Sequence, residues 1–209
     1  MNYQTDSSRR LEITLLGKFA VIYHGELVPE LNTPRLQSLL AYLALHSDAT
    51  QSRKALAFRL WPESNEEQAL TNLRKQVKFL RDALPDADQL LVGDRQTIGW
   101  VDPSALYCDV TEFRKRLSTS TTSNHSIATL KRALELYQGE LLPGCYDEWL
   151  LPLREETQQL YLAALERFST LHEGERNYSD AIQANLQLLR IDPLHEATYR
   201  RLIRLYALN

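Results

Sequence analysis

Basic side chains gathered between residues 71 and 81 offer the clearest chemistry in this sequence. The segment holds Arg74, Lys75, Lys78 and Arg81 and no acidic residue. Lysine and arginine neutralise phosphates, while nearby amide and hydroxyl groups can hydrogen-bond base edges. The combination is suited to the major groove of DNA, although an ordinary amphipathic surface helix explains it equally simply.

An apolar stripe predicts the helix that must position these groups. Leucine and valine recur at spacings of three and four from Leu70 to Leu84, which places them on one face of a 3.6-residue period. Arg74 and Arg81 flank this stripe. The residues that face away from it are Thr71, Asn72, Lys75, Lys78 and Phe79.

The neighbouring residues predict a helix-turn-helix followed by a wing. A short helical pattern begins at Ser52 and is closed by Pro62, which has no N–H group to continue a helix. Ser64 and Glu67 fit a capping box at the start of the longer helix. Apolar runs on both sides of residues 93–96 then predict a β-hairpin, with Arg95 near its tip.

The front of the chain supplies a small sheet and a first helix. Apolar and polar residues alternate over 11–15 and again over 19–23, which predicts antiparallel strands that turn at His24-Gly25. Thr33 is a suitable N-cap, with Pro34 at the first position of a helix that has a strong apolar face. The expected order is therefore sheet, three helices and hairpin.

The second half is predicted to be helical after a break at Pro103. Asp109 is expected to cap a short helix, residues 118–126 form a polar run expected to be an exposed loop, and helical periods resume at 127. Small and aromatic residues at 161–164 and 178–181 have the spacing of tetratricopeptide helix pairs, with an unrelated helical bundle as the alternative. The last helix lacks a pairing partner, which predicts a piece of a longer regulator.

Motifs in both halves resemble the Streptomyces antibiotic regulatory protein (SARP) family. They are LLGKFAVIYHGELV, TPRLQSLLAYLALH and LAFRLWPESNEEQALTNLRKQVKFLRDAL in the first half, and GELLPG, DEWL and DPLHEATYR in the second. The resemblance covers residues 11–208. It implies an α+β winged helix-turn-helix DNA-binding domain over residues 1–107, followed by an all-α, tetratricopeptide-like bacterial transcriptional activation domain over residues 108–209.

This resemblance implies a sequence-specific activator that binds tandem promoter half-sites on double-stranded DNA as a homodimer and contacts RNA polymerase. It assigns DNA reading to the wing and to Thr71, Asn72, Lys75, Gln76, Phe79 and Arg81. The phosphate contacts are expected from Arg74, Lys75, Lys78, Arg81 and Arg95. Relatives often carry arginine where Phe79 stands, so packing of this ring under the wing is favoured over contact with a thymine methyl group.

The charge balance keeps a second function open. The formal net charge is −3, and both halves are slightly acidic, whereas DNA-binding proteins are usually basic. The alternative is therefore a winged helix that does not bind DNA, joined to a tetratricopeptide-like scaffold for protein interactions. Localised cations on the long helix favour the DNA-binding hypothesis.

The sequence does not indicate an enzyme, a metal-binding protein or a membrane protein. There is no phosphate-binding glycine loop or nucleophile elbow, and the five histidines fall in separate segments, so no catalytic residue and no cofactor is expected. Cys108 and Cys145 lack the spacing of a zinc site or a disulfide framework. No apolar run reaches the length of a membrane span and the N-terminus lacks a secretory signal, which predicts a cytoplasmic protein.

Overall fold

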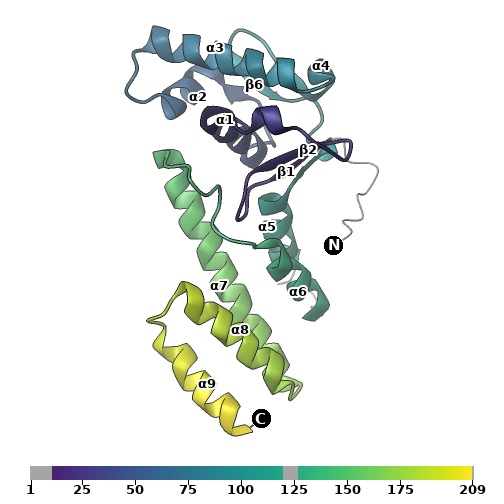
Figure 1. Ribbon diagram of the computed structural model, residues 1–209, viewed down its shortest axis with the longest axis vertical. Coiled ribbons are helices and arrows are strands. Elements are labelled where there is room, and N and C mark those ends of the chain that lie inside the picture. Colours follow the sequence, from purple (N-terminus) through teal and green to yellow (C-terminus); the bar gives the residue numbers. More distant parts are fainter. Residues whose placement is uncertain (1–10, 120–126, 209) are drawn as a thin grey trace. The chain divides into compact units, whose positions relative to one another are not determined.

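The computed structural model describes residues 11–119 and 127–208; Figure 1 traces them along the chain. They divide into two compact units. The first comprises Met1–Thr111 and Gln138–Arg154, and the second comprises Glu112–Tyr137 and Glu155–Asn209. The units thus differ from a simple division after residue 107, because residues 138–154 belong to the first unit.

A four-stranded sheet with the order β3-β2-β1-β7 opens the first unit. Its strands are β1 (Leu11–Thr14), β2 (Ala20–Tyr23), β3 (Glu26–Leu27) and β7 (Leu106–Cys108). The first three pair antiparallel, as the alternation predicts, and positive φ angles at His24 and Gly25 close the tight β2–β3 turn. The prediction missed β7, which pairs parallel with β1 and is too short to show an alternating pattern.

The helices of the first unit follow the predicted order. After the short 3-10 helix η1 (Pro29–Leu31) come α1 (Pro34–Leu45), α2 (Arg53–Leu60), α3 (Glu66–Ala83) and the single turn α4 (Ala87–Leu90). Thr33 occupies the N-cap position of α1, as expected. Helices α2 and α3 pack against each other, and α1 contacts both, so the helix-turn-helix prediction is confirmed.

The cap of α3 lies one residue later than predicted. Asn65, not Ser64, is the N-cap, and its side-chain oxygen accepts a hydrogen bond from the backbone N–H of Gln68 at 2.9 Å. The reciprocal half of a capping box is absent among the described contacts, because the Gln68 amide donates instead to the Asn72 side chain at 2.9 Å.

The predicted wing is present and has an extra strand. Strands β4 (Gln51–Ser52), β5 (Leu91–Gly93) and β6 (Thr97–Trp100) form an antiparallel sheet in the order β4-β6-β5. The indole N–H of Trp100 donates to the Leu43 carbonyl of α1 at 2.8 Å. This buried hydrogen bond attaches the hairpin to the helical core.

Asp109 joins β1 to the start of the next helix. The sequence predicts it as a helix cap, but it is the first residue of α5 (Asp109–Thr119). Its carboxylate accepts the N–H groups of Leu15 and Leu16 at 2.9 Å and that of Val110 at 2.8 Å. Burial raises the pKa of Asp109 to about 6, although these backbone hydrogen bonds oppose the rise.

The segment 138–150 adds a long-range strap to the first unit, which the sequence did not predict. The Leu142 N–H donates to the Leu15 carbonyl at 2.7 Å, and the Gly17 N–H donates to the Glu140 carbonyl at 2.9 Å. Arg154 holds the segment by donating to the carbonyls of Leu141, Leu142 and Cys145. Leu141 and Leu142 are consequently buried.

The same strap reaches α1. The Asp147 carboxylate pairs with Arg35 at 3.0 Å and accepts a hydrogen bond from the Ser38 hydroxyl. The Trp149 ring, within the 3-10 turn η3 (Glu148–Leu150), packs edge-on against Tyr42 with centroids 5.1 Å apart. The DEWL motif therefore stabilises the helix-turn-helix unit.

The second unit is helical, as predicted. Most of α5 belongs to it, together with α6 (Ile127–Leu136), most of α7 (Leu151–Gly174), α8 (Tyr178–Ile191) and α9 (Glu196–Leu208). Ala181, Ile182, Leu202 and Leu205 form the core between α8 and α9, which lie side by side in Figure 1. Of the polar run predicted as a loop, Ser118 and Thr119 are helical and residues 120–126 lie outside the described residues.

Candidate nucleic-acid interface

Helix α3 presents its cations outward from a buried stripe. Ala69, Leu73, Val77 and Leu80 are buried against the first unit's core. Arg74, Lys75 and Lys78 are exposed, and none of the three forms a salt bridge with another described residue. Unpaired cations on an exposed helix face are available to neutralise phosphates.

The amide and hydroxyl groups predicted to read bases lie beside these cations. Thr71, Asn72 and Gln76 are each partly buried. The Asn72 side-chain oxygen accepts from Gln68, so its NH2 group remains as the donor side. An approaching base must therefore offer an acceptor to Asn72 or displace Gln68.

Arg81 has structural partners as well as a predicted DNA role. Its guanidinium forms an ion pair with Asp88 of α4 and donates to the Leu91 carbonyl of β5 at 3.3 Å. These contacts connect α3 to the first strand of the wing. Because Arg81 is only partly exposed, any phosphate contact would have to use its remaining donors.

Arg53 belongs to the cationic surface, although it was not among the predicted contacts. It starts α2, and its Nε donates to the Thr97 carbonyl of the wing at 3.1 Å. Burial lowers the pKa of Arg53, and the positive charges of Arg81 and Arg74 lower it further. Three arginines from α2 and α3 thus converge beside the wing, a grouping that sequence periodicity cannot reveal.

The wing tip is built by an aspartate. One carboxylate oxygen of Asp94 accepts the N–H groups of Gln96 and Thr97, each at 2.7 Å, and these hydrogen bonds lower the pKa of Asp94. Arg95 follows Asp94 at the tip of this turn and is exposed. The turn therefore presents Arg95 to solvent, as predicted from the sequence.

The expected packing of Phe79 under the wing is wrong. Its ring is 59% exposed and lies instead beside a pocket of about 650 Å³ that is also lined by Pro34, Leu36 and Gln76. The start of α1, not the hairpin, is therefore its neighbour. Periodicity places Phe79 on the outer face of α3 but does not identify the element next to it.

Acidic residues limit where a phosphate backbone can approach α3. Glu66 and Glu67 occupy its first turn, and Glu66 pairs with Lys54 of α2 at 2.8 Å. Carboxylates at this end offset the attraction that a helix N-terminus has for phosphate. The cations of the middle of α3 are better placed for that role.

The cysteines and the described histidines do not indicate a reactive thiol or a metal site. Cys108 and Cys145 are free thiols, and burial raises the pKa of Cys108 to about 11, so it stays protonated at neutral pH. Among the described residues, no three potential ligands are grouped as a metal site requires. No described helix combines the length and apolar character that crossing a membrane demands.

The second half of the chain matches a known domain family. Residues 108–209 match the family model described as bacterial transcriptional activator domain. These residues are therefore similar to the activator domains of that family. No curated protein sequence matches the chain.

A solved structure extends the comparison to the whole fold. The chain is similar to EmbR of Mycobacterium tuberculosis, determined in complex with a low-affinity phosphopeptide, with a TM-score of 0.79 and 21% sequence identity. The likeness covers 96% of this chain but only 55% of the EmbR chain. Together, the domain match and the shared fold confirm the predicted resemblance to SARP-type transcriptional activators.

Proposed function

We propose that this chain is a sequence-specific, DNA-binding transcriptional activator that acts in the cytoplasm. The observation that supports it most is the exposed, unpaired set Arg74, Lys75 and Lys78 on the outer face of the second helix of a helix-turn-helix. Arg53 and Arg95 extend the same charge toward the wing. The domain following it is one of transcriptional activators.

The residues of this surface divide into two roles, phosphate contact and base contact. Arg53, Arg74, Lys75, Lys78, Arg81 and Arg95 contact phosphates, whereas Thr71, Asn72, Gln76 and Phe79 face the bases. Phosphate contacts position the protein and carry its salt dependence, while base contacts select the sequence. The helical half is proposed to contact RNA polymerase, and two copies are proposed to pair on DNA.

Substitution of Lys78 tests the DNA-reading surface. Lys78→Ala should weaken binding to both a selected site and random duplex and reduce the slope of log affinity against log salt by about one unit. Lys131→Ala is the matched control, because Lys131 is also exposed but lies on α6. The measurement is fluorescence anisotropy with labelled duplexes at several salt concentrations.

Equal affinities and equal salt slopes for wild type and Lys78→Ala would show that α3 is not part of the DNA interface. If wild type also failed to bind both duplexes, a scaffold whose winged helix does not bind DNA would replace this proposal. The net charge of −3 is the observation that favours that second candidate.

A further inference from the structure

A recess lined by arginines lies between α7 and α9, wholly within the second unit. Its volume is about 590 Å³. Arg167 of α7 and Arg200, Arg201 and Arg204 of α9 line it. Of the lining residues only Glu166 is acidic, and with the adjacent Glu173 and Glu196 the four arginines still outnumber the carboxylates.

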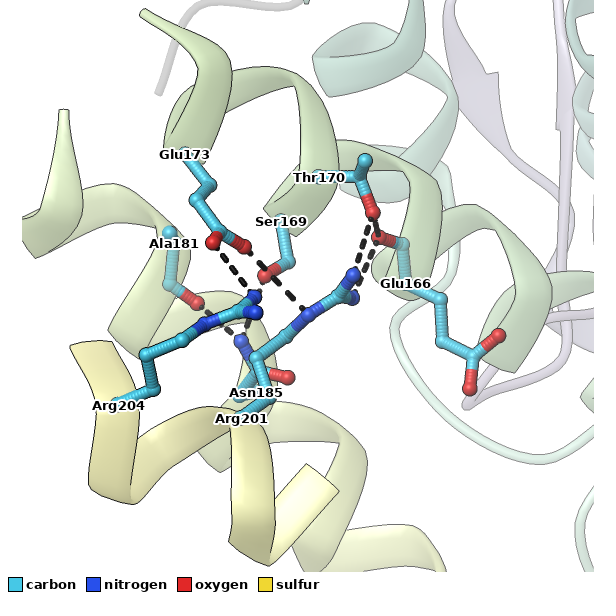
Figure 2. Close-up of polar contacts among 8 residues, drawn as sticks. All are labelled: Glu166, Ser169, Thr170, Glu173, Ala181, Asn185, Arg201 and Arg204. Atoms are coloured by element: carbon cyan, nitrogen blue, oxygen red, sulfur yellow. Dashed lines mark hydrogen bonds and ion pairs between the residues drawn. The ribbon is translucent and has the colours of Figure 1, made fainter. Parts of the chain in front are cut away.

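Arg201 is fixed in place by contacts to α7. Its guanidinium donates to the Thr170 hydroxyl at 2.9 Å and to the Glu166 carbonyl at 3.4 Å, and its Nε lies 3.6 Å from a Glu173 oxygen. Figure 2 shows these contacts along one side of α7. The arginine is therefore oriented before any ligand arrives, which lowers the entropic cost of binding.

Arg204 shares its acidic partner with Arg201. Its guanidinium lies 2.6 Å from the other oxygen of Glu173, and Figure 2 shows both arginines reaching this one carboxylate. One negative charge between two guanidinium groups leaves one positive charge uncompensated. The Arg204 side chain is 59% exposed, and Glu173 is its only hydrogen-bond partner among the described residues, so most of its five N–H donors face solvent.

Arg200 adds a cation at the rim. It pairs with Glu196 one turn earlier at 3.2 Å, but both side chains are at least 80% exposed. Ion pairs this exposed are weak and are easily exchanged for a better partner. Arg200 can therefore turn toward a ligand carboxylate at little cost.

A buried amide joins α7 to α8 next to Thr170, one of the residues that line the recess. The Asn185 side chain donates to the Ser169 hydroxyl at 2.6 Å and to the Ala181 carbonyl at 2.7 Å. Ala163 and Ala197 also line the recess, and their small side chains leave space in it. A hollow of this volume can hold a few inserted side chains.

We propose that this arginine-lined recess binds an acidic segment of a partner protein, whose aspartate or glutamate side chains insert between α7 and α9. Guanidinium groups pair with carboxylates through two parallel hydrogen bonds, which suits Arg200 and Arg204. A duplex fits less well, because a recess of about 590 Å³ admits single side chains but not the width of a double helix. The recess contains no residue of the DNA-reading surface, so its occupancy is independent of the proposed DNA binding.

Anisotropy with a short fluorescein-labelled polyglutamate peptide tests the proposal on the full chain. The peptide should bind, and its affinity should fall as salt rises. Arg200→Ala and Arg204→Ala should each weaken binding about tenfold, as expected for loss of a charge-assisted hydrogen bond. Arg190→Ala removes an exposed arginine of α8 outside the recess, and it should bind like wild type, whereas a polyglutamine peptide should not bind.

Circular dichroism and thermal unfolding establish that each variant is folded, and Arg204→Lys provides a milder change at the same position. Failure of wild type to bind polyglutamate overturns the proposal. So does equal binding by a folded Arg200→Ala, Arg204→Ala double variant. If that double variant loses affinity for duplex DNA while it keeps the peptide, the recess is a nucleic-acid surface instead.

Discussion

Asp109 is a nearly buried carboxylate whose charge has structural consequences. It is 5% exposed and accepts backbone N–H groups from β1 and from its own helix. The hydrogen bonds favour the charged form, but the loss of water around the carboxylate outweighs them and raises the pKa to about 6. Folding is therefore linked to protonation at this residue.

The sign of that linkage can be tested. The pKa of Asp109 is about 6 in the folded protein, whereas the ordinary pKa of an aspartate carboxyl is 3.8. The contribution of Asp109 to the unfolding free energy is therefore fully present below about pH 4 and is lost as the pH rises to about 6, by at most roughly 3 kcal/mol. Urea unfolding of wild type and Asp109→Asn across this range measures it.

The difference between the two proteins isolates this residue from the other carboxylates. It should change steadily between pH 4 and pH 6 and stay constant above pH 7. A difference that does not vary with pH would show that the Asp109 pKa is the same in the folded and unfolded chains.

The sequence predicted which basic side chains of α3 are exposed, but not which residues of other elements lie beside them. Arg74, Lys75 and Lys78 are exposed as the helical period requires. The convergence of Arg53 with Arg81, and the position of Phe79 beside α1, depend on how separate elements pack. A period along one helix contains no information about which other element approaches it.

Element length explains which elements the sequence revealed. Helices α1, α3 and α8 have at least twelve residues each, which is long enough for an apolar stripe to recur. Strands β4 and β7 and the single turn α4 have two to four residues and show no period. The strap over 138–150 was missed because its leucines are adjacent and their partners lie more than a hundred residues earlier.

Gly17 is the point at which the strap and the N-terminal sheet come closest. Its φ is +79°, and a Cβ added there would lie 2.7 Å from the Gln138 backbone. Gly17→Ala should therefore cost the strain of a left-handed residue, about 1–2 kcal/mol, plus a backbone clash of similar size. The measurement is the urea midpoint of the full chain.

Gly144 provides the matched control for this substitution. Its φ is +80°, but a Cβ there meets nothing within 4 Å. Gly144→Ala should show only the cost of the left-handed conformation. Equal losses in the two variants would mean that the strap does not press on Gly17.

At the scale of the whole molecule, the division between units alters what an isolated DNA-binding piece requires. A fragment ending at residue 107 looks self-sufficient from its apolar stripes, but it lacks Asp109 and the strap that contact Leu15, Leu16 and Gly17. This fragment should unfold at lower urea than a fragment ending at residue 154, as followed by far-ultraviolet circular dichroism. Identical midpoints would show that the strap contributes nothing to stability.

Pairing on DNA is a second property of the whole molecule. If two copies occupy tandem half-sites about one helical turn apart, inserting about five base pairs rotates one half-site to the opposite face of the duplex. Cooperative binding should then disappear, while binding to a single half-site is unchanged. Electrophoretic mobility shifts on the two duplexes provide the measurement, and cooperativity that survives the insertion would indicate independent monomers.

The strap also limits how such regulators can be recombined. The family match begins at residue 108, yet residues 138–154 are built into the unit that contains the helix-turn-helix. In a chimera joined at residue 107, Leu15 and Gly17 would come from one protein and the strap from the other. The residue at position 109, which contacts the backbone after β1, would also come from the other protein. Grafting a new DNA specificity onto this activator domain therefore requires exchanging residues 1–111 and 138–154 together, because these two separate stretches of sequence form one compact unit.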